Sequence, residues 1–291
     1  MAGVHPETSL PATTNVTCQN KSTTMLIKRK SIEAQANTKA GVSRSPKRKI
    51  KYAPVTLSEM DGCRFLHFGT EWVQGAMRLR KPDWLELEYA QQMMAWMLFI
   101  EKPQHIVQLG LGTASLTKFC YRQFTEARIT AIELNPAVIS ICATMFKLPD
   151  NDARLQVLEM DAEDFVNEPS RYGTLDVLQV DVYDATARGP VLDSAEFYQA
   201  CADCLKPDGI LTVNLFGDHP SYLKNIKVLK FIFDQVICLP EVHDGNVIAI
   251  AFNTRVKLDF AALHARAAQI QLDTKLPAKT WVNGIQLAMQ K

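Results

Sequence analysis

The chain has 291 residues, of which 47% are apolar, and this is enough to build the core of one large domain with appendages. Its net charge of +1 is unevenly spread: residues 1–51 hold 10 basic and 2 acidic side chains, which leaves 22 basic and 29 acidic residues, a net charge of −7, for the rest. An acidic body of this kind argues against a nucleic-acid-binding surface.

The apolar pattern indicates neither a membrane segment nor a secreted protein. The longest apolar stretch, residues 93–100, is too short to cross a bilayer. The first twenty residues are polar and lack the apolar region of a secretory signal. The seven cysteines are irregularly spaced, which is typical of free thiols in a reducing compartment. We therefore expect a cytoplasmic protein, and no His or Cys spacing predicts a metal site.

Residues 1–52 are rich in Thr, Ser, Asn and Lys without periodicity, and they predict a disordered basic tail. The run from Ser45 to Lys51 could be a nuclear-localisation or nucleic-acid patch, but its composition favours a solvated flexible tail. Met25 could also be the true start of the chain.

Residues 53–80 predict a small β-element ahead of the main domain. Two alternating segments, 55–60 and 63–68, flank the turn dipeptide Asp61-Gly62, and a third short strand follows over residues 71–79. Pro82-Asp83 then opens a helix that we expect to run to about Glu101, with one apolar stripe.

Residues 81–291 predict the main domain, in which strands and helices alternate. This alternation indicates a parallel sheet with helices on both faces. The expected strands are 106–109, 128–133, 155–159, 175–181 and 210–216. The expected helices are 114–124, 136–146, 162–167, 194–205 and 219–233, with a turn at residues 206–209 and a last helix at 258–271.

The end of the domain predicts an antiparallel hairpin, residues 235–239 followed by 246–252. A mostly parallel, seven-stranded sheet that ends in such a hairpin is the Rossmann-like arrangement of S-adenosylmethionine-dependent methyltransferases. The hairpin and the missing third glycine, at Ser115, argue against a dehydrogenase.

A glycine turn follows the first strand of this domain. Gly110 and Gly112 interrupt the chain between an apolar strand and a helical pattern, so backbone can approach a ligand there, and the helix start offers free N–H groups. The next strand ends at Glu133, a carboxylate placed to bind the two hydroxyls of a ribose. Together they predict a site for a nucleoside-containing ligand.

Further acidic residues end the later strands, where an open α/β sheet binds its ligand. Asp161-Ala162 follows the third strand and could hold an adenine amino group. Asp181 and Asp184 follow the fourth strand, and two carboxylates there suit a cationic ligand or an amine that must lose a proton. The alternative is that one of this pair caps a turn and the other is simply exposed.

These residues resemble a known family, the polyamine aminopropyltransferases, which are spermidine synthase and its relatives. The resemblance covers about residues 60–252. It is carried by Val73-Gln74-Gly75, Val107-Gln-Leu-Gly-Leu-Gly-Thr113, Ala131-Ile-Glu-Leu-Asn-Pro136, Met160-Asp-Ala162, Asp176-Val-Leu-Gln-Val-Asp-Val-Tyr-Asp184, Glu196-Phe-Tyr198 and Leu205-Lys-Pro-Asp-Gly209.

The resemblance implies transfer of the aminopropyl group of decarboxylated S-adenosylmethionine to a small amine such as putrescine, with methylthioadenosine released. By the same resemblance, Asp184 is the general base, Asp181 holds the aminopropyl ammonium of the donor, and Tyr89 lies near the acceptor amine. The remaining implied contacts bind the donor nucleoside, through Gln74, Gly110, Gly112, Glu133, Asp161 and Ala162. The family also implies a homo-oligomer, a dimer or tetramer.

The chain departs from the family in the part that handles amines. Thr113 stands where the family has an Asp that helps to hold the aminopropyl group, Tyr89-Ala90-Gln91 stands for Tyr-His-Glu, and Ala185 stands for a Pro. Two alternatives therefore stay open. One is a methyltransferase of the same fold that uses S-adenosylmethionine, and the other is a catalytically inactive, nucleoside-binding homologue.

Overall fold

The computed structural model describes residues 52–183, 192–242 and 245–290. The predicted tail up to Lys51 and the predicted base Asp184 lie outside these ranges. The described residues belong to one compact unit. No helix within the described ranges is both long enough and apolar enough to span a bilayer.

The first element is the predicted small sheet, in the order β1-β2-β3, with both pairs antiparallel. Its strands are β1 (Val55–Met60), β2 (Cys63–Phe68) and β3 (Gly75–Arg78). Asp61 and Gly62 have φ values of 52° and 75°, so the turn has the left-handed geometry that matches strand twist. The hairpin prediction is confirmed, whereas the third strand begins only at Gly75.

The prediction of one long helix from Pro82 to Glu101 is wrong. The chain instead forms a short helix α1 (Glu88–Gln92) followed by a 3-10 helix η1 (Met93–Leu98). Leu87 stands at the start of α1 and offers no side-chain cap. All six residues of η1 are buried, so this segment has no solvated face of the kind that a long amphipathic helix presents.

The main sheet has seven strands in the order β6-β5-β4-β7-β8-β10-β9. The pairs from β6 to β8 are parallel, and β10 runs antiparallel to both β8 and β9. The predicted fold class is therefore confirmed. The strands are β4 (His105–Leu109), β5 (Arg128–Glu133), β6 (Leu155–Glu159), β7 (Leu175–Val180), β8 (Leu205–Phe216), β9 (Gln235–Cys238) and β10 (Asn246–Phe252).

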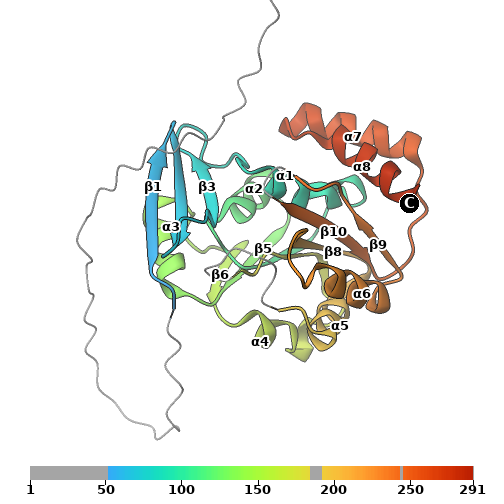
Figure 1. Cartoon of the computed structure of the whole chain (residues 1–291), viewed down its shortest axis with the longest axis horizontal. Coiled ribbons are helices and arrows are strands. Elements are labelled where there is room, and N and C mark those ends of the chain that lie inside the picture. Colours follow the sequence, from blue (N-terminus) through green and yellow to red (C-terminus); the bar gives the residue numbers. More distant parts are fainter. Residues whose placement is uncertain (1–51, 184–191, 243–244, 291) are drawn as a thin grey trace, which may run out of the picture. The chain divides into compact units, whose positions relative to one another are not determined.

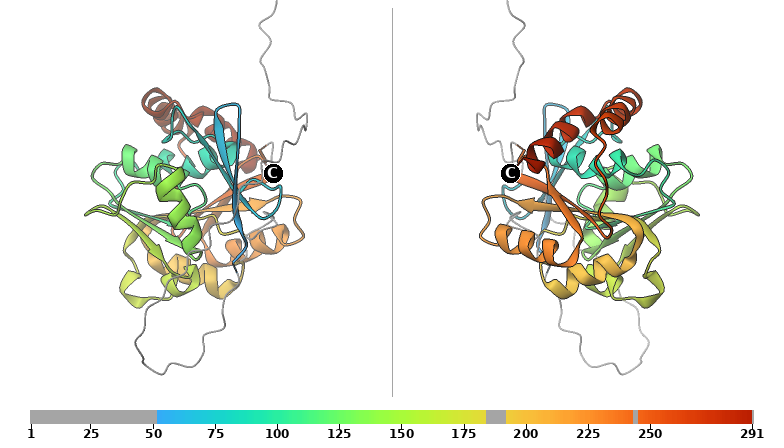
Figure 2. Two further views of the ribbon diagram at one scale, coloured as in Figure 1. Left: turned by 90° about the vertical axis from the view of Figure 1, so that its left-hand side faces the viewer. Right: turned by 90° about the vertical axis from the view of Figure 1, so that its right-hand side faces the viewer.

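Helices cover both faces of this sheet (Figures 1 and 2). One core joins the sheet to η1, α2, α3, α7 and α8, and a second core joins the other face to α4, α5 and α6. The helices are α2 (Ser115–Gln123), α3 (Pro136–Met145), α4 (Ala162–Val166), α5 (Ala195–Cys204), α6 (Tyr222–Ile232), α7 (Phe260–Thr274) and α8 (Ala278–Met289), with a short 3-10 turn η2 (Pro169–Arg171).

The turn predicted at residues 206–209 lies inside strand β8. Leu205 pairs with Leu175, but the next pair joins Val177 to Ile210, so the intervening residues bulge out of the ladder. An ion pair of 2.7 Å between Lys206 Nζ and Asp176 Oδ1 lies at the bulge. The turn-forming residues 206–209 therefore lie within one strand and do not connect two elements.

No element is predicted from the sequence beyond residue 276, where the structure has helix α8 with Gly284 on its buried face. A Cβ at Gly284 would lie 2.5 Å from Pro240 Cδ, so glycine lets the helix approach the segment after β9 closely. On the same helix Trp281, Val282 and Ile285 are at most 1% exposed.

Helix α8 should therefore contribute strongly to stability. We expect Trp281→Ala to lower the free energy of unfolding by about 3–5 kcal/mol, because it leaves a large cavity in the core. Leu287→Ala on the same helix is the matched control, since Leu287 is 56% exposed, and it should change stability by about 0.5 kcal/mol or less. Urea unfolding monitored by circular dichroism measures both. Equal losses for the two variants would contradict the packing of α8.

Candidate active site

The chain order of the main sheet reverses between β4 and β7, where an open α/β sheet binds its ligand. The backbone N–H of Asp181, just after β7, donates to Leu109 O at 2.9 Å. Gly110 then turns with φ +89°, and a Cβ at this position would lie only 2.1 Å from Asp181 O. Only glycine fits this contact, so Gly110 determines how closely the two strand ends meet.

The rest of the glycine loop rests against the small N-terminal sheet. Gly112 has φ +53°, and a Cβ there would lie 3.3 Å from Gln74 O. The hydroxyls of Thr113 and Ser115 are 2.7 Å apart, and Ser115 Oγ donates to Ala76 O of strand β3 at 3.1 Å. Thr113 is 2% exposed, so this hydroxyl pair serves as a buried link between the loop and β3.

Glu133 ends strand β5 directly beside the glycine loop. Its Oε2 accepts the backbone N–H of Leu111 at 3.0 Å, and its Oε1 accepts that of Asn135 at 2.8 Å. Burial raises the pKa of Glu133, and these backbone donors oppose the rise. Each oxygen retains a lone pair, so the carboxylate can still accept ligand hydroxyls.

Asp161 and Ala162 follow β6, as expected from the sequence. The side chain of Asp161 caps helix α4 by accepting the backbone N–H of Glu163 at 2.8 Å. Ala162 is 8% exposed. The backbone N–H of Met160 donates to Glu133 O at 3.0 Å, so the end of β6 lies next to the end of β5.

Asp181 accepts hydrogen bonds from two side chains. Asn214 Nδ2 donates to its Oδ1 at 2.9 Å, and Tyr89 Oη donates to its Oδ2 at 3.4 Å. Burial raises the pKa of Asp181 from 3.8 to about 6, against the opposing effect of these two hydrogen bonds. At neutral pH the group is therefore mostly an anion, but one that burial has made easy to protonate.

A shallow pocket, with about 300 Å³ of empty space when open solvent is included, brings several predicted residues together. Tyr89, Asp181 and Gly112 line it, together with Thr113 and the strand residue Gln108. No Lys, Arg or His lines it within the described part of the chain, so it suits a cationic ligand. The predicted residues Gln74, Gly110, Glu133, Asp161 and Ala162 lie around the strand ends without lining this pocket.

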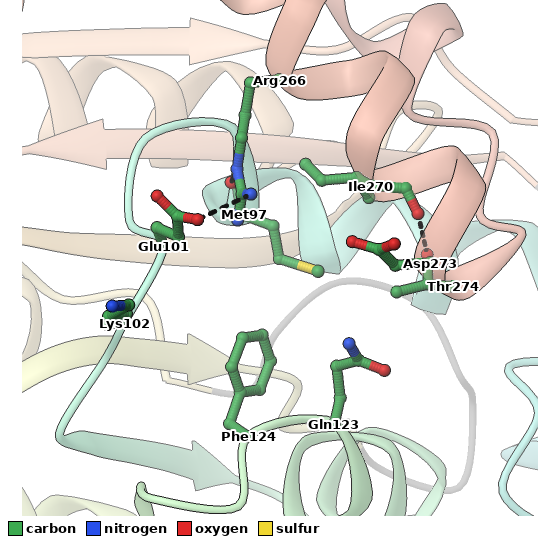
Figure 3. Close-up of a pocket in the computed structure, with 9 residues that line it drawn as sticks. All are labelled: Met97, Glu101, Lys102, Gln123, Phe124, Arg266, Ile270, Asp273 and Thr274. Carbon is green, nitrogen blue, oxygen red and sulfur yellow. Dashed lines mark hydrogen bonds and ion pairs between the residues drawn. The ribbon is translucent and has the colours of Figure 1, made fainter.

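A larger pocket, with about 530 Å³ of empty space, lies between η1, the end of α2 and α7 (Figure 3). It adjoins the amino ends of the parallel strands, since Glu101 and Lys102 precede β4. The half-buried Arg266 in this pocket already has partners, because its Nε donates to Met97 O at 3.1 Å and its guanidinium pairs with Glu101 (Figure 3). Of the predicted site residues that the structure describes, none lines this larger pocket.

Asn214 and Asn246 were missed by sequence reasoning. Asn214 is 2% exposed in the mostly apolar part of strand β8 after Gly209, and Asn246 Nδ2 donates to its Oδ1 at 2.9 Å. A lone amide inside an apolar strand was the signal that could have identified Asn214. Within the described ranges, no group of three or more His, Cys, Asp or Glu could hold a metal ion.

The contact between Gly110 and Asp181 can be tested by adding one methyl group. Gly110→Ala should lower the free energy of unfolding by about 3 kcal/mol or more, since overpacking against a carbonyl adds to backbone strain. Gly62→Ala is the matched control: Gly62 also has a positive φ, but a Cβ there meets nothing within 4 Å. It should cost about 1 kcal/mol. Chemical denaturation measures both, and similar losses would show that the contact is unimportant.

The raised pKa of Asp181 predicts a pH-dependent effect on stability. The unfolded state loses this proton near pH 3.8 and the folded state near pH 6, so the folded protein loses stability as pH rises through that interval. Asp181→Asn removes the cost, and at pH 8 the variant should be more stable than the parent by up to about 3 kcal/mol. The gain should shrink at pH 4.5. Urea unfolding at both pH values tests this, and a pH-independent difference would contradict it.

The chain matches known proteins over most of its length. The family model of the spermine/spermidine synthase domain matches residues 88–237. A polyamine aminopropyltransferase of Neisseria meningitidis serogroup A is 33% identical over 74% of this chain and 84% of its own.

Solved structures show the same fold. A probable spermidine synthase from Corynebacterium glutamicum has a TM-score of 0.64 at 18% identity and covers 81% of this chain and 92% of its own. Human methyltransferase-like protein 13, in complex with SAH, has a TM-score of 0.55 at 22% identity and covers 70% of this chain and 93% of its own. The family model and the relative at 33% identity confirm the predicted resemblance: the chain belongs to the spermine/spermidine synthase family and is a polyamine aminopropyltransferase-like enzyme.

Proposed function

We propose that the protein transfers the aminopropyl group of decarboxylated S-adenosylmethionine to a small diamine such as putrescine, and releases methylthioadenosine. The observation that carries this proposal is Asp181, a half-buried carboxylate in a pocket that no described cation lines. Such a site attracts the ammonium of the donor and its sulfonium. It would repel the carboxylate that S-adenosylmethionine itself carries.

The reaction needs an uncharged amine nitrogen. Its lone pair attacks the carbon next to the sulfonium sulfur, a C–N bond forms, and the electrons of the broken C–S bond return to sulfur. The new ammonium then loses a proton to a carboxylate, which acts as general base. We assign this base to Asp184, which follows Asp181 by three residues and lies outside the described ranges.

The donor nucleoside would bind at the ends of β4, β5 and β6. Glu133 lies beside the glycine loop and would accept the ribose hydroxyls, while Gly110 and Gly112 let the backbone approach. We place the adenine near Asp161 and Ala162, since the end of β6 adjoins that of β5. Gln74 would contact the donor from the N-terminal sheet, because its carbonyl adjoins Gly112.

The acceptor would enter on the side of Tyr89, whose hydroxyl faces Asp181. Ala90 and Gln91 stand where the family has His and Glu, so fewer charged groups lie on this side of the site. Gln91 Nε2 donates to Leu85 O at 2.8 Å, so this side chain is directed to the backbone before α1. A short diamine needs fewer contacts than a longer polyamine, which favours putrescine as the acceptor. We also propose a cytoplasmic homo-oligomer, a dimer or tetramer, by analogy with the family.

A second candidate is a homologue that binds the nucleoside but no longer transfers the aminopropyl group. Thr113 supports it, because its hydroxyl is engaged by Ser115 and carries no charge for an ammonium. In that case methylthioadenosine would still bind, while no amine would be modified.

Product detection by mass spectrometry tests the proposal. The protein is incubated with decarboxylated S-adenosylmethionine and, in separate reactions, putrescine, cadaverine or spermidine. We expect methylthioadenosine and one aminopropylated amine, with putrescine preferred. Asp184→Asn should lower kcat by about 10²–10⁴-fold, the usual effect of losing a general base.

Asp208→Asn is the matched control, because Asp208 is an exposed carboxylate in the bulge of β8, at the opposite end of the strand from the site. It should leave kcat unchanged. If the donor binds but no amine is modified, the transferase proposal is wrong and the nucleoside-binding alternative is supported. Methylation of an amine from S-adenosylmethionine would instead establish the methyltransferase.

A further inference from the structure

Two buried asparagines connect Asp181 to the antiparallel end of the sheet. Asn214 donates to Asp181 from strand β8, and Asn246, the first residue of strand β10, donates to Asn214. Asn214 pairs with Ile248 across the ladder, so Asn246 is its diagonal neighbour on the same face of the sheet. The two amides are 2% and 9% exposed, which leaves them little access to water.

The hydrogen bonds in this chain of amides run in one direction. Because Asn246 donates an N–H to Asn214 Oδ1, the carbonyl end of the Asn214 amide points to β10 and its NH2 end points to Asp181. Tyr183 supports the arrangement: its hydroxyl donates to Asn214 O at 2.9 Å and interacts with the Asn246 side chain. If the Asn214 amide turned around, its oxygen would face the Asp181 carboxylate, two acceptors together, and its NH2 would face the NH2 of Asn246, two donors together.

We propose that Asn246 is a positioning residue: acting through Asn214, it keeps an N–H donor on Asp181 and thereby keeps this carboxylate in the anionic form that binds the aminopropyl ammonium. The assignment rests on the proposed function for the identity of the ligand. The two hydrogen bonds, from Asn246 to Asn214 and from Asn214 to Asp181, form a relay that is present without ligand.

The relay matters because Asp181 is only weakly held as an anion. The titratable groups that adjoin it within the described ranges are Tyr89 from α1 and Tyr183 after β7, and neither carries a positive charge. Burial raises the pKa of Asp181, and the described groups that oppose the rise are the donors Asn214 and Tyr89. If Asn214 turned its carbonyl to Asp181, the carboxyl would hold its proton at higher pH and would bind an ammonium poorly.

A double-mutant cycle on the pKa of Asp181 tests the relay. The pKa is measured in the ligand-free protein by NMR of 13C-labelled Asp carboxyls, with Asp181→Asn to assign the signal. Asn246→Asp substitutes an acceptor of the same shape, so the Asn214 amide should turn its NH2 to residue 246. We expect the pKa of Asp181 to rise by about one unit or more. In the Asn214→Leu background, where no amide can turn, the same substitution should raise it by about half as much or less.

Asn253→Asp controls for the added charge. Asn253 follows the far end of strand β10, about 23 Å from Asn246 at the usual rise per residue, and its amide donates to Ala202 O. This distance exceeds the screening length, so the pKa of Asp181 should move by about 0.2 unit or less. Should Asn246→Asp fail to fold, Asn246→Ala enters the same cycle, with a smaller rise expected.

The outcomes separate the relay from the proposed function. Equal rises with and without Asn214 would overturn the relay, because they would show a direct effect of charge. A cycle with the expected coupling in a protein that modifies no amine would keep the relay and refute the transferase. In an active enzyme, the acidic limb of the pH profile of kcat/KM should move upward with the pKa of Asp181 in Asn246→Asp.

Discussion

The geometry of the site depends on one close contact, between Gly110 and the carbonyl of Asp181. No side chain fits between them, since even a Cβ would lie 2.1 Å from that oxygen. The contact brings the ends of β4 and β7 together at the point where the sheet order reverses. The glycine loop can then adjoin Glu133 on one side while Asp181 faces the pocket on the other. The separation of nucleoside and amine regions in the proposed function follows from this arrangement.

The sequence predicted the features that depend on local chemistry. The spacing of apolar residues and the turn residues between them predicted the hairpin at Asp61-Gly62, the alternating strands and the antiparallel end of the sheet. Acidic residues at strand ends pointed to Glu133 and Asp181, which the structure places at the end of β5 and directly after β7; their roles stay predictions. Both signals work because they are encoded within a few residues of the chain.

Features that depend on distant partners could not be predicted. Met93–Leu98 forms a 3-10 helix that is buried on every side, and a pattern of apolar residues does not reveal how many faces are covered. The buried link from Ser115 to Ala76 joins segments about 40 residues apart. Asn214 and Asn246 come within hydrogen-bond distance only when β8 and β10 pair. Asp184, the base expected from the resemblance, lies outside the described ranges and stays a prediction.

The position of helix α8 also affects how readily the protein aggregates. Strand β9 is an edge of the main sheet, and an edge strand has unpaired backbone groups with which a strand of another molecule can pair. Helix α8 packs against β9 and approaches the segment after it closely at Gly284. A chain shortened before Pro277 would expose the apolar surface under Trp281 next to that open edge. We expect such a truncation to favour strand addition at β9, so that helix α8 limits association between copies as well as stabilising the core.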